Sequence, residues 1–221
     1  MRHIIYDLDG TLVDTREGII MGIQQALESQ SVEFCVQSLN YIKIGPPIPQ
    51  ILADLCPAAN AEEKKRMYKV FRNYYDSEGW KLSQLYDGVL TVLKQLDDNQ
   101  LIQYVVTNKP KFPATQIIES KQITRYFKRL ISPDYYSLGF TSKIEMLSWL
   151  LKEEKMTKDK TCYVGDTLGD AEAAYLCGIK FIGVRYGYGD FSEMKEKTPT
   201  EYISHFLELM DCIHNWNCSN N

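Results

Sequence analysis

The chain has 221 residues, of which 44% are hydrophobic and 24% are charged, and its formal net charge at pH 7 is −4. This composition is typical of a globular protein with a buried core, and it excludes a wholly disordered chain. Because the sequence has neither a basic stripe nor an apolar run of ~18 residues, it excludes nucleic acid and membrane as expected partners and predicts a cytoplasmic protein.

Along the chain, five short apolar segments have the composition of β-strands, and helical patterns separate them. The predicted strands cover residues 3–7, 102–108, 127–132, 161–166 and 180–184. The predicted helices cover residues 88–98, 112–123, 142–155, 168–178 and, at the end of the chain, 202–216. Strands that alternate with helices predict an α/β fold with a doubly wound parallel-sheet core of the Rossmann-like kind.

Residues 15–84 interrupt this alternation, because helical patterns cover 17–30 and 59–79 and no strand is evident between them. A Gly-Pro-Pro turn precedes one further helical stretch in the same region. The sequence therefore predicts two domains, a core made of residues 1–14 and 85–221 and an inserted all-helical domain made of residues 15–84.

Polar residues follow three of the predicted strands. Asp7 ends the first strand, Thr107 and Asn108 end the second, and Asp166 ends the strand that begins at residue 161. In parallel α/β sheets, ligands bind at the carboxyl ends of the strands. We therefore expect these four residues to lie close together in one site.

The first of these strand ends carries two aspartates, Asp7 and Asp9, one residue apart. Two carboxylates this close repel each other unless a cation lies beside them. An EF-hand calcium loop is excluded, because Gly10 stands at the fourth position and the loop requires its glycine at the sixth. The pattern indicates a metal site or a reaction that needs two carboxylates, and a plain turn around Gly10 is the remaining alternative.

Three segments resemble the sequence motifs of one enzyme family. DLDGTLVDT at 7–15, VVTNK at 105–109 and VGDTLGD at 164–170 resemble the first, second and fourth motifs of the haloacid dehalogenase-like hydrolases, in the expected order. The segment GDAEAAYLCGIKFIGVRYGYG at 169–189 is further similar to the phosphoglycolate phosphatase branch. Residues 15–84 match the helical cap domain of that branch.

This resemblance implies a magnesium-dependent phosphatase that hydrolyses a small phosphorylated metabolite through an aspartyl-phosphate intermediate. It implies that Asp7 is the nucleophile, and that Asp9 protonates the leaving oxygen and then deprotonates the attacking water. Relatives that act on carbon–halogen bonds usually lack the second aspartate, so the presence of Asp9 implies phosphoryl transfer.

The metal ligands that the resemblance implies are Asp7, the backbone carbonyl of Asp9, and Asp166, because Mg²⁺ prefers oxygen ligands. Asp170 would bind the ion through water or hold the site together. Asp170 could also be present because the N-terminus of a helix favours an acidic residue, and the two roles are compatible.

The third motif of the family is a lysine, and Lys143 is predicted to supply it. Ser142 and Glu145 form a capping-box pattern that puts Lys143 in the first helical turn. A cation there interacts unfavourably with the helix dipole. This cost is offset if its ammonium group faces carboxylates and a phosphate. Many relatives have Lys-Pro where this chain has Lys-Ile, and Lys128 and Lys152 stay open as alternatives.

Thr107 is expected to donate a hydrogen bond from its hydroxyl to the transferring phosphoryl group. The other substrate-binding residues are predicted to come from the core and from a loop of the cap domain, and they are Gly10, Asn108, Lys109, Lys43 and Gly45. In the plainer interpretation, Lys109 is a solvated charge and the loop that contains Lys43 is an ordinary turn.

Other functions stay open. A sugar phosphomutase similar to β-phosphoglucomutase, a pyrophosphatase or nucleotidase, and a phosphonate-cleaving enzyme that uses Lys43 are the alternatives. The mutase is disfavoured because the helix after Asp14 contains no histidine. A non-enzymatic binding module is the least favoured, since Asp7, Asp9 and Asp166 are all present. Both a monomer and a dimer are compatible with the sequence.

Overall fold

The residues that the computed structural model describes are 1–30, 39, 42–190, 192 and 201–218. The protein divides into two compact units. Unit 1 consists of Met1–Asp14 and Leu85–Asn221, and unit 2 consists of Thr15–Gln84. Unit 1 contains a sheet and its covering helices, whereas the described part of unit 2 is built mainly from helices.

Among its described residues, unit 1 has a six-stranded sheet in the order β5-β4-β1-β6-β7-β8, and every neighbouring pair is parallel. The strands are β1 (His3–Tyr6), β4 (Ile102–Val106), β5 (Phe127–Ile131), β6 (Thr161–Gly165), β7 (Lys180–Val184) and β8 (Glu201–Ile203). β1 and β6 are buried along their whole length, as the apolar runs of a sheet covered on both faces require. The predicted doubly wound parallel-sheet core is confirmed.

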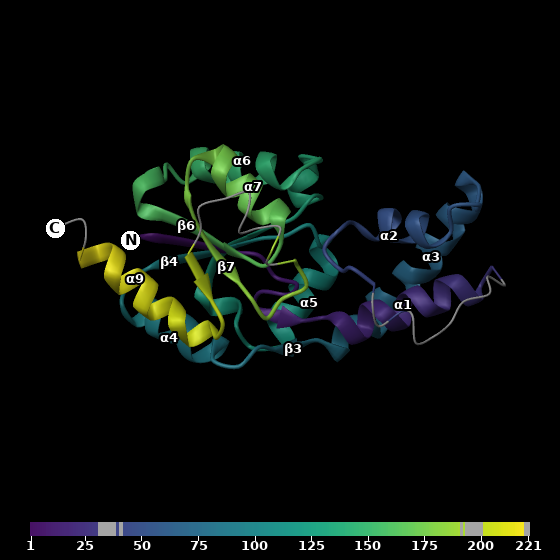
Figure 1. Cartoon of the computed structure of the whole chain (residues 1–221), viewed down its shortest axis with the longest axis horizontal. Coiled ribbons are helices and arrows are strands. Elements are labelled where there is room, and N and C mark those ends of the chain that lie inside the picture. The colour runs from purple at the N-terminus through teal and green to yellow at the C-terminus, as the bar shows by residue number, and fades with distance from the viewer. Residues whose placement is uncertain (31–38, 40–41, 191, 193–200, 219–221) are drawn as a thin grey trace. The chain divides into compact units, whose positions relative to one another are not determined.

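Helices cover both faces of this sheet (Figure 1). The described α-helices of unit 1 are α4 (Val89–Asp98), α5 (Lys111–Ser120), α6 (Lys143–Glu153), α7 (Leu168–Cys177) and α9 (Leu209–Cys218). Helices α6 and α7 pack together over one face, where Ile5, Tyr104 and Tyr163 join their core. Helix α4 lies over the other face, where Gln103 Nε2 donates to the carbonyl oxygen of Leu93 at 3.0 Å.

The end of the chain differs from the prediction of one helix over residues 202–216. Glu201–Ile203 form β8, and the last helix is Leu209–Cys218. β8 pairs in parallel with β7, which satisfies backbone groups that β7 would otherwise expose at the sheet edge, and the side chain of Ile203 is buried. The pairing of β8 depends on the exposed edge that β7 presents in the folded sheet. The local periodicity of the sequence carries no information about that edge.

The described part of unit 2 contains the helices α1 (Arg16–Glu28), α2 (Ile48–Leu55) and α3 (Ala61–Ser77). Helices α1 and α3 pack against each other. In α3, Phe71 stacks on Tyr75 with 5.4 Å between the ring centroids, and both side chains are buried. The short strands β2 (Val13–Asp14) and β3 (Gln84–Leu85) pair where the chain leaves and re-enters unit 1.

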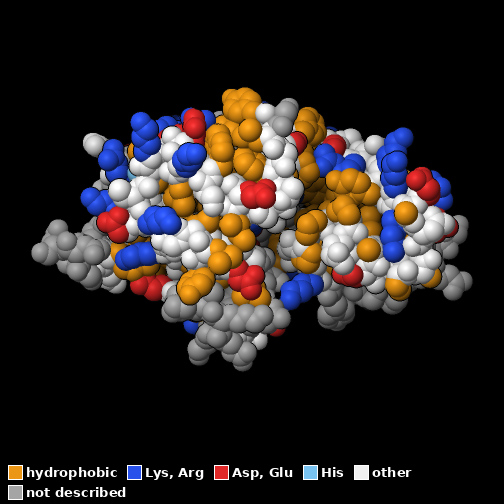
Figure 2. All heavy atoms as spheres, turned by 90° about the horizontal axis from the view of Figure 1, so that it is seen from above, with side chains coloured by type: hydrophobic (Ala, Val, Ile, Leu, Met, Phe, Trp, Pro, Cys, Tyr) orange, Lys and Arg blue, Asp and Glu red, His pale blue; other side chains and the backbone are white. Residues whose placement is uncertain are grey.

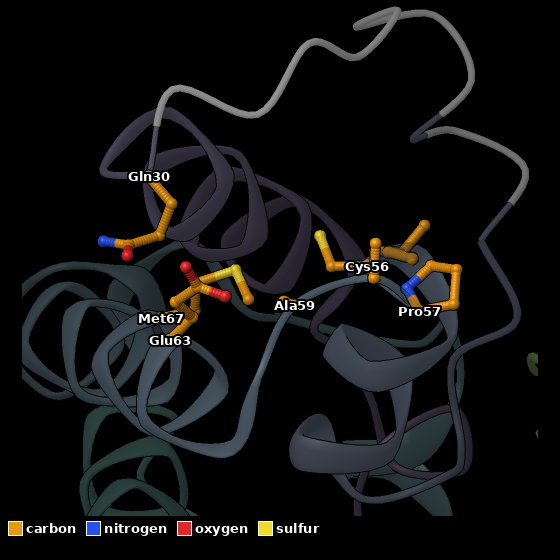
Figure 3. A pocket seen from close by; sticks show the side chains of 8 residues that line it. Gln30, Cys56, Pro57, Ala59, Glu63 and Met67 are labelled. Carbon is orange, nitrogen blue, oxygen red and sulfur yellow. The ribbon is translucent and has the colours of Figure 1, made fainter.

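Unit 2 contains a cavity of about 370 Å³ that is lined by residues of α2, α3 and the adjoining loops (Figure 3). The lining consists of Gln30, Leu55, Cys56, Pro57, Ala58, Ala59, Glu63 and Met67. Most of these side chains are apolar, and the one charged residue among the described lining residues, Glu63, accepts a hydrogen bond from the N–H of Asn60 at the start of α3. Because an anionic side chain repels phosphate, the phosphate chemistry that the sequence predicts is not expected in this cavity.

The surface carries mixed charges. On the face in Figure 2, Lys and Arg side chains are interspersed with Asp and Glu side chains and with apolar groups. Among the described residues, the large apolar side chains that are more than half exposed are Phe112, Tyr136, Tyr175, Leu176 and Leu207. Within the described part of the chain, every helix is too short or too polar to cross a bilayer.

Candidate active site

The candidate active site lies at the edge of the sheet where β1, β4 and β6 end. Tyr6, the last residue of β1, pairs with Val105 of β4 and with Val164 of β6, so the three strands end nearly level with one another. Asp7 follows β1, and its N–H donates to the carbonyl oxygen of Val164 at 2.9 Å. The sheet therefore holds the backbone of Asp7 at this edge.

Three buried carboxylates converge there. Asp166 follows β6, and Asp170 lies in the first turn of α7. One carboxylate oxygen of each of Asp7, Asp166 and Asp170 lies within 4.8 Å of the other two. Asp7 is only 5% exposed, and Asp166 and Asp170 are fully buried. Like charges this close and this buried require a cation nearby.

A lysine supplies part of that positive charge. Lys143 is the first residue of α6, and its Nζ lies 2.5 Å from Asp170 Oδ1 and 3.2 Å from Asp7 Oδ1. Only 9% of the Lys143 side chain is exposed. By contrast, Lys128 pairs with a glutamate at the end of α6, and Lys152 is exposed. Of the three lysines that the sequence left open, the structure places Lys143 against the carboxylates.

The local sequence determines where α6 begins. Ser142 is the N-cap, and its Oγ accepts a hydrogen bond from the N–H of Glu145 at 3.2 Å. The carboxylate of Glu145 accepts from the N–H and the hydroxyl of Thr141 at 2.8 and 3.0 Å. Helix α6 therefore starts at Lys143, and the buried contacts of its ammonium group offset the unfavourable position of a cation at a helix N-terminus.

Burial and mutual repulsion shift the pKa values of the cluster. Burial raises the pKa of Asp7 well above its usual range; Lys143 opposes this shift, and Asp170 and Asp166 add to it. Burial and the charge of Asp170 raise the pKa of Asp166 to about 7. Burial lowers the pKa of Lys143, but the charges of Asp170 and Asp7 outweigh it, so the net shift is upward. A further positive charge would favour the ionised form of all three carboxylates.

The residues present fit a divalent cation such as Mg²⁺. Asp7 Oδ1 is buried and accepts no hydrogen bond from the described residues, although Lys143 Nζ lies 3.2 Å away as an ion pair. Asp166 accepts a hydrogen bond on Oδ1 from the hydroxyl of Thr11 at 3.2 Å and on Oδ2 from the N–H of Tyr188 at 2.7 Å. Each Asp166 oxygen therefore keeps acceptor capacity, and carboxylate oxygens are the ligands that Mg²⁺ prefers.

Asp170 is hydrogen-bonded on both oxygens. Its Oδ1 accepts from Lys143 Nζ and from the hydroxyl of Tyr163 at 3.0 Å. Its Oδ2 accepts from the N–H and the hydroxyl of Thr167 at 3.0 and 2.6 Å, and the two residues form a capping box at the start of α7. Two hydrogen bonds to each oxygen use the acceptor capacity of a carboxylate. Asp170 therefore completes the capping box of α7 and also binds the ammonium group of Lys143.

A second ion pair involves Asp9. Lys109 Nζ lies 2.8 Å from Asp9 Oδ1, and the Lys109 side chain is only 6% exposed. The backbone N–H of Lys109 donates to Thr107 Oγ1 at 3.1 Å, which leaves the hydroxyl proton of Thr107 able to reach another acceptor. Lys109 is therefore a buried, paired cation and not a solvated charge.

Gly10 allows the chain to pass close to Asp166. Its φ of +78° is rarely adopted by other residues, and a Cβ atom at Gly10 would lie 2.2 Å from Asp166 Oδ2. Asn108 is exposed, and Lys43 and Gly45 belong to unit 2. Substrate binding by Gly10, Asn108, Lys43 and Gly45 stays a prediction.

Four residues that contact the aspartates escape prediction from the sequence, namely Thr11, Tyr163, Thr167 and Tyr188. Thr167 has a local signal, because a threonine three residues before an acidic residue at a helix start is a capping-box pattern. Tyr163 and Tyr188 have none. Their contacts depend on how the strand and the later loop pack, which the sequence pattern does not report.

Comparison with known proteins assigns the family. The chain matches the family model of haloacid dehalogenase-like hydrolases over residues 4–184. The chain belongs to the haloacid dehalogenase-like hydrolases. The matched range of this hydrolase includes Asp7, Lys143 and Asp166, which the fold brings together although they are far apart in the sequence.

Several proteins are similar to this haloacid dehalogenase-like hydrolase over nearly its whole length. A 5'-nucleotidase from Pseudomonas aeruginosa is 30% identical over 96% of this chain and 95% of its own length. A phosphoglycolate phosphatase from Photobacterium profundum is 25% identical over 96% of both chains. The crystal structure of a Clostridium difficile protein described as a phosphatase is 31% identical, with a TM-score of 0.85 over 96% of this chain and 97% of that chain.

Proposed function

We propose that this hydrolase is a magnesium-dependent phosphatase that releases inorganic phosphate from a small phosphorylated metabolite. One observation carries the proposal. The buried carboxylate of Asp7 has an oxygen without a hydrogen bond and lies beside both Asp166 and Lys143 at the sheet edge. The family membership and the names of the relatives, a 5'-nucleotidase and a phosphoglycolate phosphatase, support the same class of reaction.

In the first step, a carboxylate oxygen of Asp7 attacks the phosphorus atom of the substrate. A bond from Asp7 to phosphorus forms as the bond to the leaving oxygen breaks, and Asp9 gives its proton to that oxygen. In the second step, Asp9 takes a proton from a water molecule whose oxygen displaces Asp7 from phosphorus. The products are the dephosphorylated metabolite, inorganic phosphate and the restored carboxylate of Asp7.

Three other side chains would act on the charge of the transferring group. Lys143, beside Asp7, counters the negative charge that gathers on the phosphoryl oxygens. The hydroxyl of Thr107 would donate a hydrogen bond to one of those oxygens. Lys109 would hold the Asp9 carboxylate through their ion pair whenever Asp9 is ionised, and its positive charge would favour binding of the phosphate.

Asp7, Asp166 and the backbone carbonyl of Asp9 would hold the Mg²⁺ ion, as the family resemblance implies. When bound, the ion supplies positive charge that neutralises the phosphate and the carboxylates around it. Asp170 would orient Lys143 and not bind the ion directly, because hydrogen bonds already occupy both of its oxygens.

The metabolite itself is proposed to be phosphoglycolate or a related small phosphate ester. A nucleoside monophosphate is the second candidate, because the 5'-nucleotidase relative is 30% identical to this chain. Unit 2 would act as the cap domain that chooses between them, since the core residues recognise only the phosphate group. Lys43 and Gly45 are the residues of unit 2 proposed to take part in substrate binding.

Removal of the metal is expected to abolish turnover. With Mg²⁺ present, the protein should release p-nitrophenol from p-nitrophenyl phosphate, excess EDTA should reduce the rate to background, and added Mg²⁺ should restore it. Release of inorganic phosphate from phosphoglycolate, nucleoside monophosphates, sugar phosphates and pyrophosphate would identify the substrate. Turnover that survives chelation would contradict the metal dependence, and no release from any of these compounds with Mg²⁺ would contradict the phosphatase proposal.

The variant Asp9→Asn is expected to slow the hydrolysis of esters with poor leaving groups most. Loss of a general acid typically lowers the rate by about 10²–10⁴-fold, and p-nitrophenolate needs the least help from an acid. The measurement is kcat/KM over a series of phosphate esters with leaving groups of increasing pKa. Asp97→Asn, at an exposed position of α4, is the matched control. An equal loss across the whole series would argue against the acid role of Asp9.

A further inference from the structure

The loop of residues 185–189, with the sequence Arg-Tyr-Gly-Tyr-Gly, follows β7 at the same edge of the sheet as the aspartates. The backbone N–H of Tyr188 donates to Asp166 Oδ2 at 2.7 Å. The hydroxyl of Thr11 donates to the other oxygen of Asp166 at 3.2 Å. The carboxylate of Asp166 is therefore held from two sides, and the 185–189 loop provides one of them.

The side chain of Tyr188 makes a second contact in a different direction. Its hydroxyl donates to Asp14 Oδ1 at 2.7 Å. Asp14 is the last residue of unit 1 before the chain continues into unit 2 at Thr15. A single residue thus bonds the Asp166 carboxylate through its backbone and the outgoing connection to unit 2 through its side chain.

The other tyrosine of the loop contacts the same region of unit 1. The hydroxyl of Tyr186 donates to the carbonyl oxygen of Thr11 at 2.8 Å. The ring of Tyr186 also packs on that of Tyr86, with 4.5 Å between the centroids. Tyr86 follows Leu85, where the chain returns to unit 1. The loop therefore contacts both the outgoing and the returning connection.

A glycine between the two tyrosines permits this close packing. A Cβ atom at Gly187 would lie 2.2 Å from Asp166 Cβ and 2.5 Å from the carbonyl oxygen of Gly10. Any larger residue at this position would push the loop away from Asp166 and lengthen the hydrogen bond from Tyr188. The alternation of tyrosine and glycine combines hydrogen-bonding side chains with a close approach of the backbone.

We propose that Tyr188 is a positioning residue that couples Mg²⁺ binding at Asp166 to the hydrogen bond at Asp14. The inference rests on the proposed function, in which Asp166 is a metal ligand. The hydrogen bond from the Tyr188 hydroxyl to Asp14 holds the side chain of Tyr188 in place. The backbone N–H of Tyr188 then keeps the Asp166 carboxylate oriented so that the remaining lone pairs of that carboxylate are available to the ion. Coupling between two sites is reciprocal, so bound Mg²⁺ also favours the state in which Tyr188 holds Asp14.

The test removes only the Tyr188 hydroxyl. Tyr188→Phe keeps the ring and the backbone N–H, and its Kd for Mg²⁺, measured by isothermal titration calorimetry on the full chain, is expected to rise about 5- to 30-fold. The Tm in EDTA should fall by at most about 4 °C. Tyr175→Phe, on the exposed side of α7, is the matched control and should bind Mg²⁺ as wild type does.

A double-variant cycle with Asp14→Ala separates coupling from general damage. If both changes act through the same hydrogen bond, the Kd of the double variant for Mg²⁺ should be no higher than the higher of the two single-variant Kd values. Asp14→Ala also tests the coupling by itself if Tyr188→Phe does not fold. Unchanged Kd values in the single variants, or additive effects in the cycle, overturn the inference and leave the proposed function intact. Failure of the wild-type protein to bind Mg²⁺ overturns both.

Discussion

Replacing Asp7 with asparagine is expected to lower kcat for phosphate release by at least about 10³-fold while the protein stays folded. Asparagine has the shape of aspartate, but its amide cannot supply the oxygen that attacks phosphorus. Asp166 and Asp170 do not replace it, because hydrogen bonds to Thr11, Thr167 and other donors hold their carboxylates in place. Steady-state kinetics with p-nitrophenyl phosphate at saturating Mg²⁺ measure the loss.

The same variant should keep or gain stability when no metal is present. Burial raises the pKa of Asp7 in the folded protein, so the ionised carboxylate destabilises the folded state at neutral pH and a neutral amide removes that cost. Lys143 keeps its contact with Asp170. The Tm in EDTA should therefore equal or exceed that of wild type, and Asp97→Asn should change neither Tm nor kcat. A folded Asp7→Asn protein with wild-type turnover would show that Asp7 is not the nucleophile.

Replacing Lys143 with methionine is expected to damage both stability and activity. Methionine has a similar length but no charge, so Asp7 and Asp170 would stay buried without their cation. Removing one partner of a buried pair costs about 3–5 kcal/mol, which thermal unfolding in EDTA would detect. Mg²⁺ should recover part of this loss because it binds the folded state. At saturating Mg²⁺, kcat should still be lower by about 10²–10³-fold.

Lys152→Met is the matched control for this experiment. Lys152 lies on the same helix, α6, but is exposed, so its substitution should change the free energy of unfolding by less than about 0.5 kcal/mol. Its kcat should equal that of wild type. If Lys143→Met lost no more stability and activity than Lys152→Met, the assignment of Lys143 as the lysine of the site would be wrong.

Much of unit 1 is predictable from the sequence because the signals are local. The strands that precede Asp7 and Asp166 are short, largely apolar runs, and an aspartate follows each of them directly. Ser142 marks the start of α6 because its hydroxyl satisfies a backbone N–H of the first turn. The strand β8 is not predictable in this way, since its pairing depends on a sheet edge built by β7.

Local sequence patterns are sufficient to predict most of the alternating strands and helices of unit 1 and the residues that follow each strand, because both depend on neighbours within a few positions. Parallel strands then bring Asp7 and Asp166 to one edge without further information. The contacts of Lys143 with Asp7 and of Tyr188 with Asp166 become evident only in the folded protein. These contacts join residues far apart in the chain, so they depend on how helices and loops pack on the finished sheet. That packing brings Lys143, and not Lys128, to the aspartates.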